Sequence, residues 1–64
     1  MEIEKMNYIC VVKIGNDGVQ ELITMYRDEV IDFFGVIKDI KGNGYQVDSI
    51  HYENENTIAI YVIE

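Results

Sequence analysis

Residues 6–27, with the sequence MNYICVVKIGNDGVQELITMYR, decide the fold. Residues 6–14 are rich in β-branched side chains, which favour a strand, and a turn-forming cluster, GNDG, follows at 15–18. Asn-Asp-Gly after an alternating strand is a hairpin signal, because Gly18 accepts a left-handed backbone that other residues avoid. We therefore expect residues 19–27 to form a second strand. On this strand we expect Leu22, Thr24 and Tyr26 on one face and Ile23 and Met25 on the other.

One long helix is the alternative interpretation of this region. Apolar residues continue at spacings of four and three beyond residue 27, and Asp17 with Gln20 could form a capping box. The helix would then span residues 18–41, about twice the average helix length, in a chain with little to pack along it. We favour ββαββ over this βαββ alternative. Both arrangements are α+β, a small single-layer β-sheet with one helix packed on one face.

Residues 28–41 have the pattern of an amphipathic helix. Asp28 is placed to cap its N-terminus, and the GNG run at 42–44 ends it. The expected apolar stripe consists of Val30, Phe33, Phe34, Ile37 and Ile40. The opposite side carries an acidic ridge of Asp28, Asp32 and Asp39.

The C-terminal part predicts a second pair of strands. Residues 45–53 and 57–63 are strand-like, and the ENEN run at 53–56 suits a short hairpin connection. In the strand from Tyr45 the apolar positions change parity, which indicates a β-bulge near Asp48-Ser49 or an edge position. We expect a single domain, 1–64, with residues 1–5 loosely attached.

Two of the predicted strands, residues 6–14 and 57–63, are apolar on both faces, which is typical of central strands. One helix covers only one face of a sheet, so the other face should expose apolar side chains and form an interface. We expect a homodimer, packed sheet to sheet or joined edge to edge. The residues expected on the uncovered face are Ile9, Val11, Ala59, Tyr61 and Ile63. The predicted dimer or partner interface consists of Ile9, Val11, Tyr52, Tyr61 and Ile63.

The chain carries twelve acidic residues against five Lys and Arg, a net charge of −7. Direct binding to nucleic acid or to an anionic membrane is not expected, because phosphate groups are contacted by Lys and Arg. The charge is concentrated in residues 15–32 and 45–64, each with a net −4. A basic protein surface is the partner that such a surface fits. The residues predicted to bind it are Asp28, Asp32, Asp39, Glu53 and Glu55.

The sequence contains no coherent catalytic or metal-binding set. On a strand, Ser49 and His51 share a face that excludes Asp48, so these residues do not form a Ser-His-Asp relay. Cys10 lies in an apolar strand and is expected to be a small buried hydrophobe, since zinc sites use more ligands. We expect no enzyme activity, no cofactor and no metal. The single Cys and the absence of a signal peptide or a long apolar run predict a cytoplasmic protein.

In size, acidity and a codon bias inferred from eleven Ile and five Asn, the chain resembles small accessory proteins of phages or mobile elements. That resemblance involves no defined motif. It implies a protein that binds and blocks a host protein. The leading hypothesis is a non-enzymatic, acidic, dimeric inhibitor or modulator of a partner with a basic surface, such as a nucleic-acid-handling enzyme. The alternatives are a binder of a signalling metabolite with its pocket at a dimer seam, and a purely structural or assembly protein.

Overall fold

The computed structural model describes residues 6–64, which form four strands and one helix in the order ββαββ. The elements are β1 (Asn7–Ile14), β2 (Gln20–Asp28), α1 (Phe33–Gly42), β3 (Gln46–Asn54) and β4 (Thr57–Ile63). The favoured order is confirmed, and the long-helix alternative is wrong. The prediction for residues 1–5 lies outside the described residues.

A tight turn separates β1 from β2 and excludes the long helix. The backbone N–H of Gly15 donates to the carbonyl of Val19 over 2.9 Å, and the N–H of Gly18 donates to the carbonyl of Gly15 over 2.9 Å. Gly18 has a φ of 82°, a conformation that favours glycine. The turn therefore depends on Gly18, the residue that the sequence pattern predicted to adopt a left-handed backbone.

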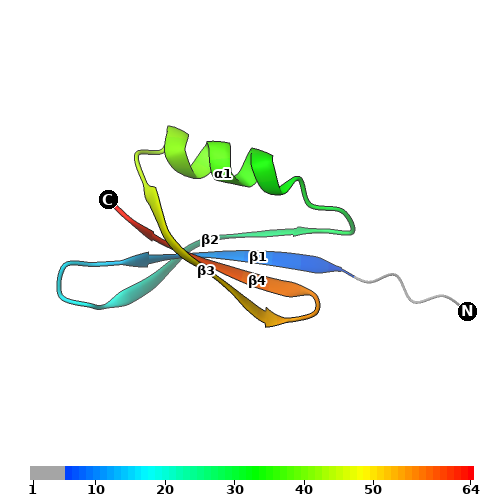
Figure 1. The fold of residues 1–64 in the computed structure, drawn as a ribbon, viewed down its shortest axis with the longest axis horizontal. Helices are drawn as coiled ribbons and strands as arrows, with labels where there is room; N and C mark the ends of the chain where they lie inside the picture. Colours follow the sequence, from blue (N-terminus) through cyan, green and yellow to red (C-terminus); the bar gives the residue numbers. More distant parts are fainter. Residues whose placement is uncertain (1–5) are drawn as a thin grey trace, which may run out of the picture.

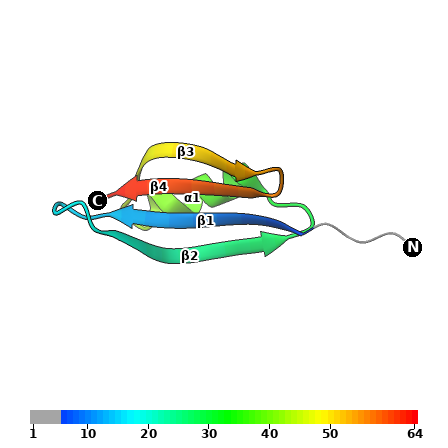
Figure 2. The same cartoon turned by 90° about the horizontal axis from the view of Figure 1, so that it is seen from below.

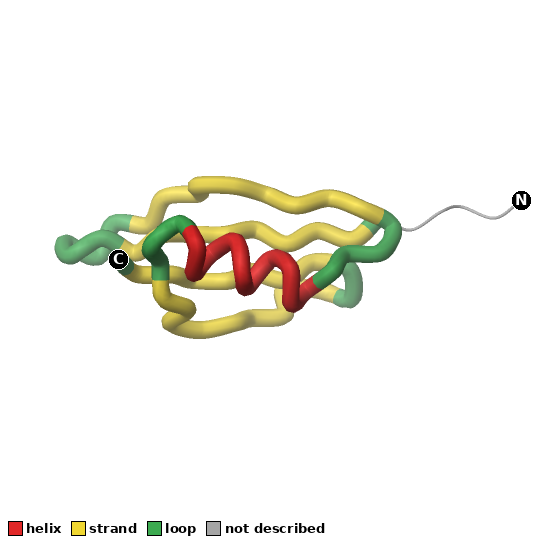
Figure 3. The backbone as a smooth tube through the Cα atoms, turned by 90° about the horizontal axis from the view of Figure 1, so that it is seen from above, coloured by secondary structure: helices red, strands yellow, loops and turns green. Residues whose placement is uncertain are grey.

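The four strands form one mixed sheet in the order β2-β1-β4-β3 (Figures 1 and 2). The central pair, β1 and β4, is parallel, and each edge strand pairs antiparallel with its central neighbour. The helix lies across one face of the sheet, as seen from above in Figure 3. The prediction that the first and last strands are central is confirmed.

The core lies between α1 and the two central strands. In the parallel register, Ile9 is opposite Ile58 and Val11 is opposite Ile60, so these residues share the face that α1 covers. The Cβ atoms of paired residues point to the same side of a sheet. Val11 and Ile60 therefore both lie under α1, where they are fully buried. The buried cluster consists of Ile9, Val11, Val36, Ile40, Ile60 and Val62.

The helix begins five residues later than the sequence indicates. Asp32, not Asp28, is the N-cap, and its side chain accepts a hydrogen bond from the N–H of Gly35. Asp28 instead ends β2, opposite Asn7 of β1. Strand pairing therefore extends to the residue expected to cap the helix. Val30 and Phe34, expected in the apolar stripe, are 83% and 80% exposed.

Each edge strand contains a register shift that changes which residues share a face. In β2 the shift leaves Ile23 without a paired residue, so Leu22 and Met25 lie on one face and Ile23 and Tyr26 pack toward the core. The expected grouping of Leu22 with Tyr26 is therefore wrong. In β3 one shift falls at Asp48, which confirms the predicted bulge, and a second falls at Glu53.

Candidate interaction surfaces

Among the described residues, α1 covers one face of the sheet and no element covers the opposite face, which we call the open face (Figure 2). Its side chains are those paired on the side away from the helix. β1 and β4 supply the centre of the face, and the edge strands supply its flanks. The open-face residues used below are Tyr8, Cys10, Val12 and Ile14 of β1, Leu22 and Met25 of β2, Ser49 and His51 of β3, and Ala59, Tyr61 and Ile63 of β4.

Near the centre of the open face two rings pack against each other. The ring centroids of His51 and Tyr61 lie 5.2 Å apart with their planes at 90°. The Nε2 atom of His51 is 3.1 Å from the hydroxyl of Ser49. His51 is paired with Ala59, whose side chain is buried. On β2, Leu22 and Met25 are 59% and 51% exposed.

The structure places the predicted interface residues in three different environments. Tyr61 and Ile63 lie on the open face, as expected. Ile9 and Val11 are instead core residues with 2% and 0% exposure, so they do not offer a surface to a partner. Tyr52, in register with Ile58, lies on the helix side of the sheet and is 80% exposed.

The sequence pattern correctly predicted that β1 and β4 are apolar on both faces. It did not predict which face of β1 lies on the same side of the sheet as which face of β4. Since β1 and β4 are parallel and in register, Cys10 lies beside Ala59 and Val12 beside Tyr61. On β1, the open face therefore consists of the residues that alternate with Ile9 and Val11, and not of Ile9 and Val11 as expected. The open-face apolar residues missing from the expected set are Tyr8, Cys10, Val12, Ile14, Leu22 and Met25.

A second surface lies at the end of the molecule formed by the β2–α1 loop (29–32) and the β3–β4 turn (55–56), which we call the loop end (Figure 1). The loop is attached to β1, because the side-chain amide of Asn7 donates to the carbonyl of Glu29 over 2.6 Å. The β3–β4 turn is attached through the N–H of Tyr8, which donates to the carbonyl of Asn56 over 2.8 Å. Both connections are thus held on the first strand.

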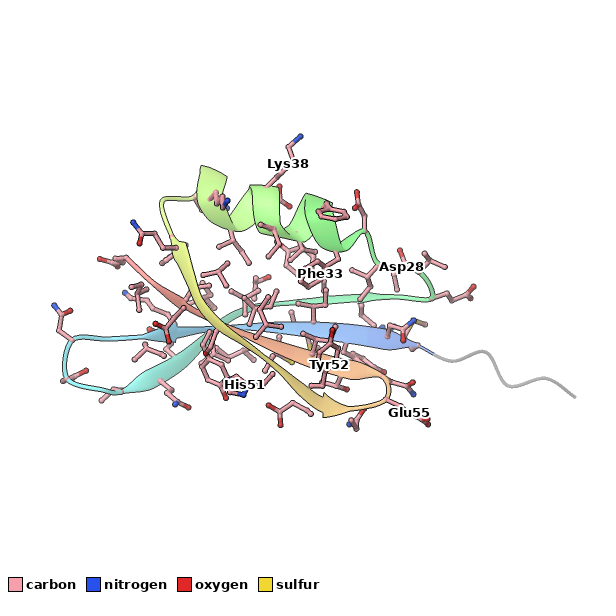
Figure 4. The ribbon with its side chains drawn as sticks, viewed as in Figure 1. Asp28, Phe33, Lys38, His51, Tyr52 and Glu55 are labelled. Carbon is pink, nitrogen blue, oxygen red and sulfur yellow. The ribbon has the colours of Figure 1, made fainter. Side chains whose placement is uncertain are left out.

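An apolar cleft of about 430 Å³ opens at the loop end. Val30 and Ile31 of the loop, Phe33 of α1, and Tyr52 and Ile58 of the hairpin line it. Figure 4 shows Tyr52 and Phe33 on facing elements, with Glu55 at the hairpin tip. Glu29 and Glu55 also contribute to its lining. The cleft is therefore apolar inside and acidic at its rim.

The three carboxylates of the predicted ridge line one shallow groove between β2 and α1. Asp28, Asp32 and Asp39 contribute to this groove, which shares Val30 and Ile31 with the apolar cleft. The sequence predicted all three in the helix, but the structure places Asp28 at the end of β2, Asp32 at the helix N-cap and Asp39 in the helix body. The cleft and the groove form one continuous surface.

Local contacts hold these carboxylates in place. The backbone N–H of Glu29 donates to the Asp28 carboxylate over 2.7 Å. The hydroxyl of Tyr26 approaches the Asp39 carboxylate at 3.5 Å. Burial, followed by the negative charge of Asp39 and by this contact, raises the pKa of the Tyr26 phenol. The phenol therefore remains a neutral donor toward Asp39 at neutral pH.

Ser49, His51 and Asp48, the residues considered for a catalytic relay, all lie on β3. His51 contacts Ser49 and Tyr61 on the open face, and Asp48 occupies the bulge of the edge strand. No group of three or more His, Cys, Asp or Glu side chains in this part of the chain is arranged to hold a metal ion. Of the elements that the structure describes, none is a helix long and apolar enough to cross a membrane.

Comparison with known proteins adds no functional information. No protein-family model matches the chain, and neither a curated protein nor a solved structure gives a significant match.

Proposed function

We propose that this protein is a non-enzymatic, acidic interaction protein that binds a basic surface of a partner protein through its loop end and thereby inhibits or modulates that partner. One observation carries the proposal. Three large apolar side chains at the loop end, Val30, Phe34 and Tyr52, are each 80% or more exposed. Val30 and Tyr52 line the apolar cleft, Val30 also lines the groove that holds Asp28, Asp32 and Asp39, and Phe34 follows Phe33, which lines the cleft.

Exposed apolar anchors surrounded by charge are typical of protein-binding surfaces. Aromatic residues supply most of the binding energy at such sites, and surrounding polar groups exclude water and set specificity. Phe34 makes an edge-to-face contact with Phe33, with ring centroids 6.4 Å apart, which favours one orientation of the exposed ring. A preorganised aromatic group loses less conformational freedom when a partner covers it.

Charge supports a basic partner. The carboxylates of Asp28, Asp32 and Asp39 share one groove, and Glu55 lies beside the adjacent cleft. A net charge of −7 accelerates the encounter with a positive surface and opposes the approach of a negative one. Proteins that contact nucleic acid carry such positive surfaces, because their grooves bind phosphates.

The test begins with affinity capture on the immobilised full chain from a bacterial lysate, followed by identification of the retained protein. The affinity of the purified pair is then measured at low and high salt. We expect binding to weaken steeply with salt, since surface charges are screened within about 10 Å at 0.1 M ionic strength. Asp28→Asn, Asp32→Asn and Asp39→Asn combined should weaken it further.

A matched control removes the same number of negative charges at positions away from the loop end. The combination Asp17→Asn, Glu21→Gln and Asp48→Asn removes three carboxylates outside the apolar cleft and the acidic groove. This control should retain most of the affinity, whereas Phe34→Ala with Tyr52→Ala should lose it. An affinity that responds to neither salt nor the loop-end substitutions would disprove the proposal.

A further inference from the structure

We infer that a second copy of this chain covers the open face, so that the protein is a homodimer of two sheets packed face to face with the helices outside. This inference concerns the side of the sheet opposite α1 (Figure 2). It is independent of the proposed binding of a partner at the loop end. Three features of the open face support it: its apolarity, its size and its distribution of charge.

The apolarity of the open face is that of an interface. Its centre is formed by alternate residues of the two central strands, which in a sheet with one solvated face would be polar. Val12 lies beside Tyr61 and Cys10 beside Ala59, and the exposed side chains of Leu22 and Met25 extend the surface onto β2. A contiguous apolar surface of this kind marks an interaction site.

The size of the face is sufficient for a stable dimer. Four strands of seven to nine residues, spaced about 4.8 Å apart with roughly 3.3 Å per residue, give a projected area of roughly 500 Å². Two such faces packed together would remove roughly 1,000 Å² from water, about the smallest area expected of a specific interface. A second copy of the chain, whose open face has the same dimensions, would therefore cover the whole face.

Charge distinguishes a second copy from a basic partner. Strand pairing places Arg27 of β2, in register with Tyr8, on the open face; together with Glu53 it leaves the face without net charge, although the chain carries −7. Glu53 reaches this side only at the β3 edge, next to His51. Two copies of an acidic protein can approach closely only through a face without like charges. A basic partner would gain nothing from such a neutral face, whereas an identical neutral face is complementary to it.

The first test is sedimentation equilibrium of the full chain from low to high micromolar concentration. We expect a reversible monomer–dimer equilibrium. The double variant Leu22→Glu, Met25→Glu places like charges across the interface and should raise the dissociation constant about a hundredfold. Both side chains are more than half exposed on an edge strand, and circular dichroism checks that the fold is kept.

The matched control is Val30→Glu with Phe34→Glu, which adds the same charge at exposed apolar positions on the other side of the sheet. It should leave dimerisation unchanged while weakening partner binding. Loss of the dimer and loss of partner binding are thereby separated. A monomeric wild-type chain at high micromolar concentration would overturn the inference. A double variant as dimeric as the wild type would also overturn it.

Cys10 provides a second measurement that needs no variant at the interface. It is the only cysteine of the chain, and it lies half-buried at the centre of the open face. Its reaction with a bulky thiol reagent should slow as the protein concentration rises, because the dimer covers it. In the variant Leu22→Glu, Met25→Glu the rate should be independent of protein concentration. A rate without concentration dependence in the wild type counts against the dimer.

Discussion

The carboxylate of Asp32 caps the helix by accepting a hydrogen bond from the backbone N–H of Gly35, with Oδ1 3.1 Å from the nitrogen. This bond satisfies one of the N–H groups that the first helical turn leaves unpaired. The same contact places the Asp32 side chain against the only position in that turn without a Cβ atom. A Cβ built on Gly35 would lie 2.8 Å from Oδ2 of Asp32. The two residues therefore act as a unit.

Replacing Asp32 should show the contribution of the cap to stability. We expect Asp32→Ala to lower the free energy of unfolding by about 1 kcal/mol, the usual effect of losing an N-cap. Asp32→Asn keeps an acceptor for the Gly35 N–H and should stay within a few tenths of the wild type. Urea denaturation followed by circular dichroism measures both. Equal losses in the two variants would show that the charge, not the hydrogen bond, matters.

Replacing Gly35 should have an effect that depends on Asp32. Alanine ordinarily stabilises a helix interior by about 1 kcal/mol relative to glycine. In the wild type, the new Cβ must displace the Asp32 carboxylate from the cap, so Gly35→Ala should give no gain. In the Asp32→Ala background the obstacle is absent, and the same substitution should stabilise. A double-mutant cycle by urea denaturation measures this coupling, and additive effects would contradict it.

The C-terminus of α1 depends on a left-handed glycine. The N–H of Tyr45 donates to the carbonyl of Ile40 and the N–H of Gly44 to that of Lys41, each over 3.1 Å, which is the Schellman pattern. Gly44 has a φ of 89°, and open space surrounds its Cβ position. Gly44→Ala should therefore cost about 1 kcal/mol through backbone strain alone.

Gly42 is the matched control for this substitution. It also has open space at its Cβ position, but it ends the helix without a positive φ. Gly42→Ala should be neutral or slightly stabilising in the same thermal and urea unfolding measurements. If both alanine variants lost the same stability, the positive φ of Gly44 would not be the cause of its loss.

The strands were predictable because their signals are local. Residues 57–63 are rich in β-branched side chains, and β4 has these bounds in the structure. The helix start was not predictable in this way. Asp28 satisfies the local rules for an N-cap as well as Asp32 does, and only the pairing of Asp28 with Asn7 assigns it to β2. That pairing joins segments far apart in the sequence.

The composition of the open face depended on a similar long-range relationship. Alternation within β1 separates Ile9 and Val11 from Cys10 and Val12, but it does not say which pair faces the helix. The parallel register with β4 decides this by placing Val11 beside Ile60. The existence of an apolar uncovered face followed from the sequence, whereas its residues followed from the topology.

Lys13 and Glu64 form an ion pair at the other end of the sheet, with Nζ 2.7 Å from Oε1. The hydrogen bond and charge of Lys13 lower the pKa of Glu64, and those of Glu64 raise the pKa of Lys13. The Glu64 contribution to stability is therefore present above its unfolded pKa and is lost as the pH falls through the folded value. The Lys13 contribution is present below its unfolded pKa and is lost as the pH rises through the folded value.

Substitution of Lys13 should reveal this pair directly. In Lys13→Gln the pKa of Glu64, followed by NMR titration of its side-chain carboxyl carbon, should rise toward the ordinary glutamate value. High salt should produce part of the same rise in the wild type, because exposed ion pairs are screened. Stability itself should change little, since such surface pairs contribute weakly. A Glu64 pKa that is the same in both proteins would mean that the pair does not persist in solution.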